Sequence, residues 1–445
     1  MITLTQCKDL SQRIASRVDA EQYEVILYHT TEALTRFANS SIHQNVQSHE
    51  SEIQLRLIKG LHSSVTKTSD LSEEGLDWLV RHSQEQLKNS APMNEPIQLP
   101  SSGETIVSDS PKQDRSDAFK EPEYRARIVS QVCEEANKNA VRAFGSFSTT
   151  QQALFVMNSN HTVAYNESTQ AQLISQMMQD SSSGFAQSTA SHIQMIEADR
   201  VKRESVDLCL RGRNPRDLEP GEYEVVLLPE AVEDILSMIA HMGFSTVAIQ
   251  EGRSFLSGKQ HQQVFDQKLT LSDFCHHSLQ ADLPFDFEGV PKQKVEMIQN
   301  GIFRSFVTDS KWAAKLQIPN TGHALMAPNP FGPFPLHMVV ETTGDASLAE
   351  LIQQVKKGVL ITRFWYANPI HPKMGTCTGL TRDGTFLIEN GRIAYPIRNL
   401  RYTDNLVDMM NSIQVMTREK RFYNGMVVPA MHCRSMRFVS QAPQS

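Results

Sequence analysis

Three dipeptides in the second half of the chain, Asn300-Gly301, Asp383-Gly384 and Asn390-Gly391, each lie between runs of alternating apolar and polar residues. Asn-Gly and Asp-Gly readily adopt the positive φ angles of a two-residue hairpin turn. Alternation with a period of two is typical of a strand with one buried face. We therefore predict three β-hairpins, and with them a β-rich, mainly antiparallel domain over residues 216–445.

The first half of the chain mixes helical and strand-like patterns. Residues 23–67 predict three or four strands, and Ser72 is placed to cap a helix over 72–89. Two further helices are expected over 3–20 and 123–140, and strands joined by a tight turn at 158–160 follow the last of them. Residues 90–122 are rich in Pro, Ser and charge and predict a linker. We expect an α+β N-terminal domain over 1–215, so the fold class is α+β, with the Arg/Asp/Pro-rich stretch 211–222 as the boundary.

Charge and composition limit the function classes. The net charge of −7 argues against nucleic acid as a partner, since phosphate binding needs concentrated Lys and Arg. No apolar run approaches the roughly 20 residues that cross a bilayer, and the first residues resemble no signal peptide. We therefore expect a cytoplasmic protein with no membrane partner. Its six scattered cysteines contain no C-x-x-C pair, so they are expected to be reduced.

One segment, YEVVLLPEAVEDILSMIAH at 223–241, joins a strand to a helix. Pro229 suits the first turn of a helix because its missing N–H has no intrahelical partner there. Glu230, Glu233 and Asp234 suit the same turn because carboxylates interact favourably with the positive end of the helix dipole. We predict a helix over 230–242, the one helix that we expect in the C-terminal domain.

Several blocks along the chain resemble the TldD/PmbA family of DNA gyrase modulators, which are understood as peptidases. They are LPEAVED after a strand, EGRSFLSGKQHQQVFDQKLTLSD, PFDFEGVPKQKVEMIQNGIFRSFVTDSKWAAKL and TRDGTFLIENGRIAYPIRNLRYTDNL. The most specific is the block at 285–291, followed by Asn300-Gly301. The resemblance implies an α+β N-terminal domain and a β-rich C-terminal domain, in agreement with the patterns above.

The resemblance also implies a site at the start of the 230–242 helix. In the active TldD-like branch this helix carries His-Glu-x-x-x-His, in which two histidines bind zinc and the glutamate activates a water. In this sequence the three positions hold Pro229, Glu230 and Asp234. The cysteine that the active branch supplies near its C-terminus has no counterpart in 416–430, and Cys433 lies slightly beyond. The resemblance therefore implies a PmbA/TldE-like chain with no metal or other cofactor of its own, and zinc only on a partner subunit.

Other groups of residues offer alternatives to a chain without a metal. A relocated metal site is conceivable from Asp234, His241 and Cys433, and another from the run 275–277, Cys-His-His. Neighbours in a strand point to opposite faces, which disfavours that run. Cys377, beside a predicted turn, is an alternative nucleophile. Each of these residues can also be explained as an ordinary structural side chain with no part in chemistry.

A stretch of mixed aromatic and polar residues predicts the substrate-binding surface. Arg363, Trp365, Tyr366 and Asn368 are of types enriched in contact surfaces, although a strand with one buried face explains them too. Asp286 and Glu288 are expected to be structural.

Our hypothesis is a non-catalytic, metal-free subunit of a peptide-cleaving complex, inactive alone. It would pair with a TldD-like zinc peptidase subunit, as a heterodimer or larger assembly, or with itself, and would bind unfolded or modified peptides in extended form. The alternatives are a stand-alone peptide-binding or scaffold homodimer, and a peptidase with a relocated metal or thiol site.

Overall fold

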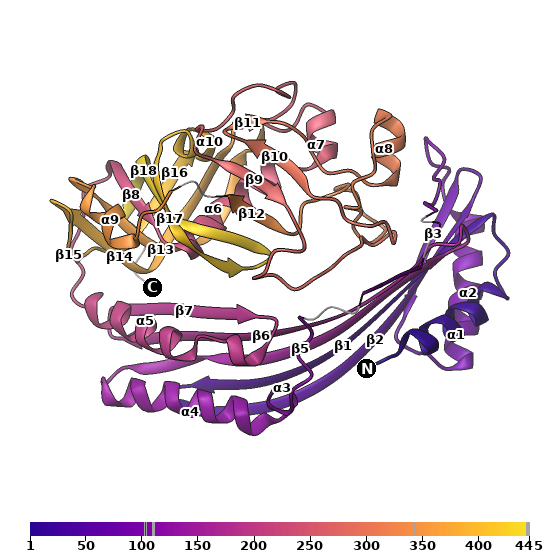
Figure 1. Ribbon diagram of the computed structural model, residues 1–445, viewed down its shortest axis with the longest axis horizontal. Coiled ribbons are helices and arrows are strands. Elements are labelled where there is room, and N and C mark those ends of the chain that lie inside the picture. Colours follow the sequence, from indigo (N-terminus) through magenta and orange to yellow (C-terminus); the bar gives the residue numbers. More distant parts are fainter. Residues whose placement is uncertain (102, 104, 109–111, 342–343, 442–445) are drawn as a thin grey trace.

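The computed structural model describes residues 1–101, 103, 105–108, 112–341 and 344–441. Two β-sheets organise the chain, and Figure 1 shows them as two layers. A long curved sheet built from residues of the first half lies below. The more compact sheet of the second half lies above it. The chain is thus an α+β protein with a sheet-rich C-terminal region, as predicted.

The lower sheet has the strand order β3-β2-β1-β5-β6-β4, with β7 also paired to β6. All these pairs are antiparallel except β4 with β6. Its strands are β1 (Gln22–Ala38), β2 (Ser41–Lys59), β3 (His62–Thr68), β4 (Thr105–Ser108), β5 (Arg142–Asn158), β6 (Val163–Gln179) and β7 (Ser182–Ala190). The segment 23–67 therefore forms three strands, within the predicted number, and the predicted turn after Asn158 is present.

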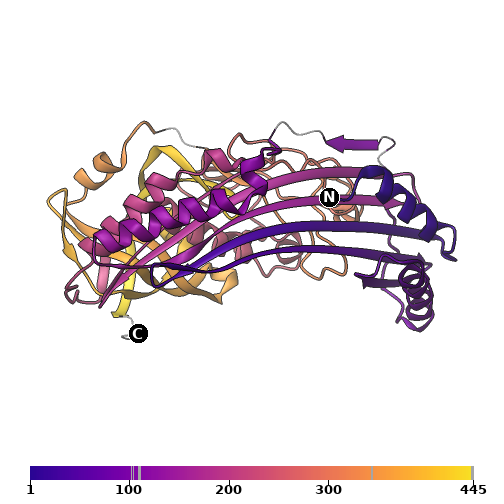
Figure 2. The ribbon, with the colours of Figure 1, turned by 90° about the horizontal axis from the view of Figure 1, so that it is seen from below.

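The two faces of the lower sheet follow from the alternation along β1. Its odd-numbered residues Val25 and Leu27 pack against α1 and α2, and Phe37 packs against α4. Even-numbered Ile26 packs against Phe285 of the C-terminal half. The helices on the odd face are α1 (Leu4–Ala15), α2 (Glu73–Asn89), α4 (Pro122–Lys138) and α5 (Ala198–Arg211). Figure 2 shows α4 lying across the underside of the long strands.

Helix starts were predicted more closely than helix ends. The Ser72 side chain accepts a hydrogen bond from the N–H of Gly75, so it caps α2 as expected. The helix expected over 3–20 ends at Ala15, and a short connection leads from it to β1, which begins at Gln22.

The upper sheet has the order β11-β10-β9-β12-β18-β16-β14-β13-β8, and β15 and β17 pair with β14 and β18. It is mainly antiparallel, with parallel pairs at β12–β18 and β13–β8. Its strands are β8 (Gly221–Leu227), β9 (Thr270–Asp273), β10 (Val295–Gln299), β11 (Ile302–Phe303), β12 (Met338–Glu341), β13 (Lys357–His371), β14 (Thr376–Glu389), β15 (Arg392–Pro396), β16 (Leu400–Asn405), β17 (Ile413–Tyr423) and β18 (Met426–Gln441).

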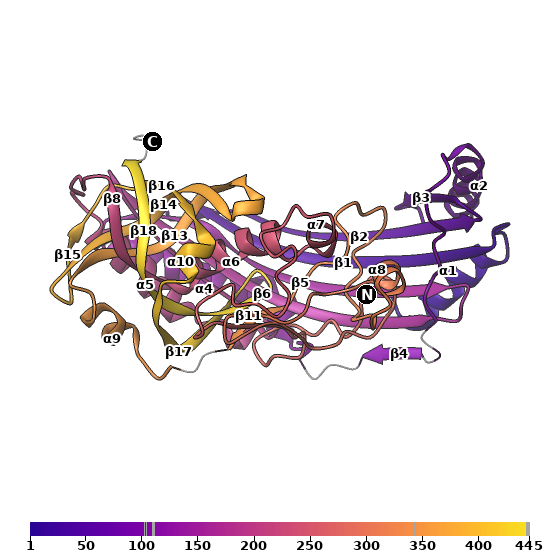
Figure 3. The same cartoon turned by 90° about the horizontal axis from the view of Figure 1, so that it is seen from above.

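The C-terminal half holds more helices than the one that we expected. The expected one is α6 (Pro229–Gly243), the longest of this half. The additional helices are short: α7 (Thr246–Gln250), α8 (Ser310–Leu316), α9 (Leu348–Gln353) and α10 (Leu406–Met410). Figure 3 shows α6, α7 and α8 from above, over the long strands. Within the residues that the structure describes, no helix is both long and apolar enough to cross a membrane.

Two of the three predicted hairpins are confirmed. Asn390-Gly391 joins β14 to β15, and Asn300-Gly301 joins β10 to β11. The prediction at Asp383-Gly384 was wrong, because β14 continues through these residues. Both have positive φ, at 55° and 130°, and together they lie opposite Thr362 of β13. The dipeptide therefore forms a β-bulge rather than a turn.

The predicted linker at 90–122 carries regular structure in its described part. β4 pairs in parallel with β6, and the short helix α3 (Asp117–Lys120) precedes α4. Residues 102, 104 and 109–111 lie outside the described residues. β4 is mostly exposed and its pairing is long-range, so the local sequence carries little sign of it. The domain boundary near 215 stays a prediction.

Candidate functional site

Helix α6 places a row of carboxyl groups at the junction of the two halves. Leu228 is extended, and Pro229 at the first helical position fixes the φ angle that starts the helix. The apolar residues that follow pack into the main core of the upper layer: Ala231, Val232, Ile235, Leu236 and Ile239. This packing holds the start of α6 in place. Of the three acids that we expected in the first turn, only Glu230 lies there, and Glu233 and Asp234 lie in the next turn.

Glu230 is buried among charged and hydroxyl groups. Burial raises the pKa of Glu230, an effect that the guanidinium of Arg421 and the hydroxyl of Tyr423 oppose. The Tyr423 hydroxyl is itself buried and makes no hydrogen bond of ordinary geometry. Burial and the charge of Glu230 raise the pKa of Tyr423 well above its usual value. Glu230 thus faces a cation and a phenol from β17, within a closed part of the junction.

Arg421 links α6 to the N-terminal half. Its two terminal nitrogens lie 3.1 and 2.9 Å from the two carboxylate oxygens of Glu204 on α5. Arg200, one turn earlier on α5, donates to Glu204 at 2.8 Å. Burial alone would raise the pKa of Glu204, but Arg421 and Arg200 outweigh it and lower the pKa. Bidentate Arg–carboxylate pairing of this kind fixes orientation as well as distance.

Glu233 contacts a hairpin turn that our sequence reasoning missed. The Asn424 side-chain amide donates to Glu233 at 3.2 Å. Asn424 and Gly425, with φ angles of 47° and 83°, form the turn between β17 and β18. Asn-Gly was the signal that found two other hairpins, so the same rule would have found this one. Burial and the neighbouring Asp234 raise the pKa of Glu233 to about 8.

Asp234 joins the start of α6 to β13. Its Oδ2 accepts a hydrogen bond from the backbone N–H of Phe364 at 2.7 Å. Burial raises the pKa of Asp234 to about 7, against the opposing effects of this N–H and of Arg363. The structure therefore brings the positions of the zinc motif next to the predicted substrate-binding stretch, although Asp234 and Arg363 are 129 positions apart in the sequence.

Arg363 is engaged within the chain. Its Nε donates to Asp383 Oδ2 at 2.7 Å, and its guanidinium lies 3.9 Å from the ring centroid of Phe185 on β7. The other oxygen of Asp383 accepts from Gln176 and Ser183 of the N-terminal sheet, at 3.0 and 2.6 Å. The pair thus fastens the bulge in β14 to β6 and β7.

The other three residues predicted to bind substrate lie at the surface. Trp365 is 49% exposed and Tyr366 is 70% exposed, and the Asn368 side chain bonds to the Tyr366 carbonyl at 2.9 Å. Tyr366 lies in a second bulge and has a φ of 55°, which turns it out of the β13 ladder. Arg382 stacks on Trp365 at 4.7 Å from the ring centroid. Their role in binding stays a prediction.

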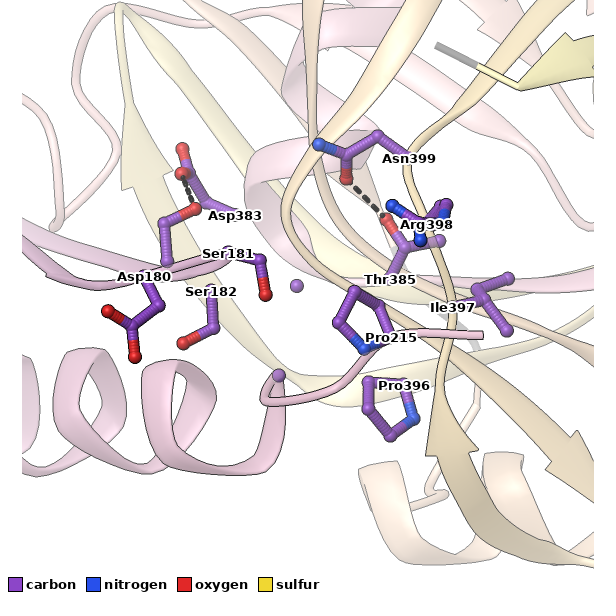
Figure 4. A pocket seen from close by; sticks show the side chains of 13 residues that line it. Asp180, Ser181, Ser182, Pro215, Asp383, Thr385, Pro396, Ile397, Arg398 and Asn399 are labelled. Carbon is purple, nitrogen blue, oxygen red and sulfur yellow. Dashed lines mark hydrogen bonds between the residues drawn. The ribbon is translucent and has the colours of Figure 1, made fainter. Parts of the chain in front are cut away.

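A polar cavity of about 310 Å³ lies beside the Asp383 bulge (Figure 4). The turn between β6 and β7 forms one wall with Asp180 and Ser181, and β14 forms another with Thr385. The Thr385 hydroxyl donates to the side-chain oxygen of Asn399, the residue before β16, at 3.2 Å. Like the Arg363 contacts, this cavity lies between the two halves of the chain.

A second cavity, of about 260 Å³, separates the ends of two edge strands. Residues 188–191, at the end of β7, line one side and residues 419–423 of β17 line the other. Within the described residues, β7 pairs only with β6, and β17 forms its ladder with β18. Part of each outer edge is occupied, since Arg200 donates to the Gln187 carbonyl of β7 at 2.9 Å and Thr417 of β17 forms an isolated bridge with Ala346. The parts that face the cavity, at 188–190 and 419–423, are edges that an extended chain could pair with.

The residues at the motif positions do not fit a zinc ion. Pro229 has no ligand atom, and Asp234 is bonded to the Phe364 N–H. Cys433 is fully buried in β18, and burial raises the pKa of its thiol to about 12, whereas zinc binds a thiolate. Among the described residues, no group of three or more His, Cys, Asp or Glu side chains is arranged to hold a metal ion.

The alternative sites are dispersed or closed. His241 is exposed at the far end of α6, whereas Cys433 is buried. In the 275–277 run, Cys275 is buried while His276 lies 3.6 Å from Asp282. Cys377, near the start of β14, is fully buried and donates to the Asn368 carbonyl, so its thiol is not exposed for the alternative role of nucleophile.

Two family domains match the chain. Residues 220–440 match the PmbA/TldA metallopeptidase C-terminal domain, and residues 23–86 match the PmbA/TldA metallopeptidase domain 1. Together the two matches cover well over half of the chain.

Curated relatives and solved structures agree with these matches. A zinc metalloprotease TldD homolog of Saccharolobus solfataricus is 29% identical over 217 residues, 47% of this chain and 46% of the relative. A metalloprotease PmbA homolog of Haemophilus influenzae is 28% identical over 203 residues, 45% of this chain and 42% of the relative. The matched part of the chain thus spans about half the length of these relatives.

The fold similarity covers nearly the whole chain. TldE from Thermococcus kodakarensis superposes with a TM-score of 0.86 at 18% identity, covering 98% of this chain and 100% of that one. A protein from Thermotoga maritima described as a modulator of DNA gyrase gives the same score at 16% identity, covering 97% and 100%. With both family domains in place, the chain is a member of the PmbA/TldD metallopeptidase family.

Proposed function

We propose that this chain is a peptide-binding subunit that lacks its own metal and works with a zinc-bearing, TldD-like chain in peptide cleavage. The proposal rests first on the Asp234–Phe364 hydrogen bond. This bond commits the residue at the second histidine position to holding α6 against β13. The proline at the first histidine position supplies no donor atom.

Without an adjacent metal ion to acidify a water, Glu230 has no activated water from which to take a proton. In a zinc peptidase the glutamate takes a proton from a water that the metal has already acidified. Here Glu230 lies beside Arg421, which is paired with Glu204. We assign Glu230 a structural role in the junction and no proton transfer to substrate.

Peptide binding is supported by the edge strands and by the exposed aromatic residues. An extended peptide gains main-chain hydrogen bonds by adding to a free strand edge, and the cavity between β7 and β17 offers two such edges. Trp365 and Tyr366 supply exposed apolar area on the same C-terminal half. Arg363 then positions β13 through Asp383 and is not itself a ligand for the peptide.

The experiment compares this chain alone, a relative with an intact His-Glu-x-x-x-His motif alone, and the two mixed. We expect no stoichiometric zinc and no cleavage of an unfolded peptide by this chain, and cleavage that rises when the two are combined. Size-exclusion chromatography should show a mixed complex. Stoichiometric zinc together with cleavage by the lone chain would disprove the proposal.

The same measurements separate the alternatives. A homodimer that does not bind the zinc-bearing chain would favour the alternative of a stand-alone scaffold protein. If cleavage by the lone chain is lost on Cys377→Ala or Asp234→Ala, a relocated thiol or metal site is favoured instead.

A further inference from the structure

A closed polar junction that involves no residue of α6 joins the N-terminal sheet to the turn at 285–291. Glu24 on β1 lies opposite Arg56 on β2, so their side chains share one face of the sheet. Gln54 lies two residues from Arg56 and points to the same face. Ile26 of this face packs against Phe285, which places all three polar residues on the side that the turn covers.

The turn brings two more carboxyl groups to the junction, and both accept backbone hydrogen bonds. Asp286 accepts from the N–H groups of Glu288, Val290 and Ala324, at 2.9, 2.9 and 2.8 Å. Glu288 accepts from the N–H of Ser310 at 3.2 Å. Burial and the neighbouring Glu288 raise the pKa of Asp286 to about 7, and the N–H groups that donate to Asp286 oppose this rise because they favour its charged form.

Glu24 has much poorer partners. It is 1% exposed, and the nearest cation is Arg56, with Nη1 at 3.8 Å. The other charged groups near the junction are Asp286 and Glu288 from the turn, and Asp309 and Lys311 from the start of α8. Acidic groups therefore outnumber cations, and Glu24 is the acid without a backbone donor.

Several buried polar atoms here have no hydrogen-bond partner among the residues that the structure describes. They are Oε2 of Glu24, Nε of Arg56, and both amide atoms of Gln54, a side chain that is only 1% exposed. Buried polar groups in folded proteins nearly always have a partner. A proton on Glu24 would convert its free oxygen into a donor, and Gln54, diagonally across the β1–β2 pair, offers an unused acceptor.

We propose that this junction is a proton-binding site: Glu24 carries a proton at neutral pH, and loss of that proton to solvent loosens the turn at 285–291 from the N-terminal sheet. The site is independent of peptide binding. It couples the contact between the two halves of the chain to pH.

The electrostatic environment supports this assignment. Burial raises the pKa of Glu24 from 4.5 to about 8; Arg56 opposes the shift, and Glu288 and Asp286 add to it. An acid whose pKa is raised by folding stabilises the folded state while it is protonated. That contribution is fully present below the ordinary pKa of 4.5 and is lost as the pH rises through about 8.

The direct test is Glu24→Gln, which mimics the protonated acid, with Glu32→Gln as the matched control at an exposed position of the same strand. Urea unfolding is measured between pH 5 and pH 9 on the full chain. We expect the folded-to-unfolded ratio of the wild type to fall, relative to Glu24→Gln, by up to about tenfold per pH unit within this window. The Glu32→Gln variant should follow the wild type.

A second measurement locates the effect. Hydrogen exchange of the Glu288, Val290 and Ala324 amides, corrected for intrinsic rates, should accelerate at pH 9 in the wild type and not in Glu24→Gln. If Glu24→Gln does not fold, infrared spectra of the wild type with ¹³C-labelled glutamate decide the question. A protonated-carboxyl band that disappears as the pH rises through about 8 supports the proposal. Equal pH dependence of the wild type and Glu24→Gln, or absence of that band at neutral pH, overturns it.

Discussion

The Asp234 carboxylate accepts a hydrogen bond from the backbone N–H of Phe364 at 2.7 Å, so a side chain near the start of α6 closes the hydrogen bonding of β13 where its ladder is interrupted. In the catalytic branch of the family this position is expected to hold a metal ligand. Here it holds two secondary-structure elements together. A side chain that makes one strong internal contact is poorly placed to make a second one with an ion.

Replacing Asp234 should separate its hydrogen bond from its charge. Asp234→Ala leaves a buried N–H without a partner and should lower the free energy of unfolding by about 1–3 kcal/mol. Asp234→Asn keeps an acceptor and should cost less. The pKa of Asp234 is raised by burial to about 7, so the stability given by its protonated form is lost as the pH rises through that value. Urea unfolding at pH 5 and pH 9 checks this. The free energy of unfolding of Asp234→Asn should rise relative to that of the wild type only at pH 9.

The Glu204–Arg421 pair should couple the two halves. Glu204→Gln removes one charge of a partly buried bidentate pair, and we expect a loss of about 1–3 kcal/mol of unfolding free energy. Because Arg421 and Arg200 lower the pKa of Glu204, its contribution is present above the ordinary carboxyl pKa and is lost as the pH falls through the lowered value. A double-mutant cycle with Arg421→Gln measures the coupling. A coupling near zero would contradict a linking role.

Two neighbouring arginines make a matched pair for the Asp383 bulge. Arg363→Ala leaves the buried Asp383 carboxylate without its close cation and should cost about 3–5 kcal/mol. Arg382 is more exposed and lies 3.9 Å from the same carboxylate, so Arg382→Ala should cost less than about 1 kcal/mol. Chemical denaturation of both variants gives the comparison. Equal losses of unfolding free energy in the two variants would mean that the close contact between Arg363 and Asp383 adds no stability.

Tyr366 allows binding to be separated from stability. A positive φ costs a non-glycine residue about 1–2 kcal/mol, so Tyr366→Gly should leave the stability unchanged or raise it by up to about 1 kcal/mol. If Tyr366 contacts peptide, the same variant should bind an unfolded peptide several-fold more weakly. Fluorescence anisotropy with a labelled peptide measures this, and Phe331→Ala, which also removes an exposed aromatic side chain, serves as the control. Undiminished peptide binding would remove Tyr366 from the predicted surface.

Local signals in the sequence predicted the elements that depend on local chemistry. The Ser72 cap and the turns at Asn300-Gly301 and Asn390-Gly391 are set by backbone preferences of two to four residues. Asp383-Gly384 has the same composition but forms a bulge. The difference is tertiary: Arg363, Gln176 and Ser183 hold the Asp383 side chain from three other strands.

The candidate site was predictable in its residues and not in its contacts. The carboxyl groups near the start of α6 follow from the sequence around Pro229. Their partners Arg421, Asn424 and Phe364 lie 130 or more residues away and carry no local sign of the pairing. Cys377 was misjudged for a related reason, because β13 and β16, which flank it on both sides, pair with β14 through contacts that no local pattern shows.

The strands β1, β5 and β6 each run for 17 residues, about 55 Å, without a break. One end of these strands carries α1 and α2, and the other carries α4 and α5. Both groups of helices therefore sit on the same continuous strands, and α5 presents Glu204 to Arg421 of β17. That one ion pair thus helps to set the orientation of a sheet about 55 Å long against the C-terminal half.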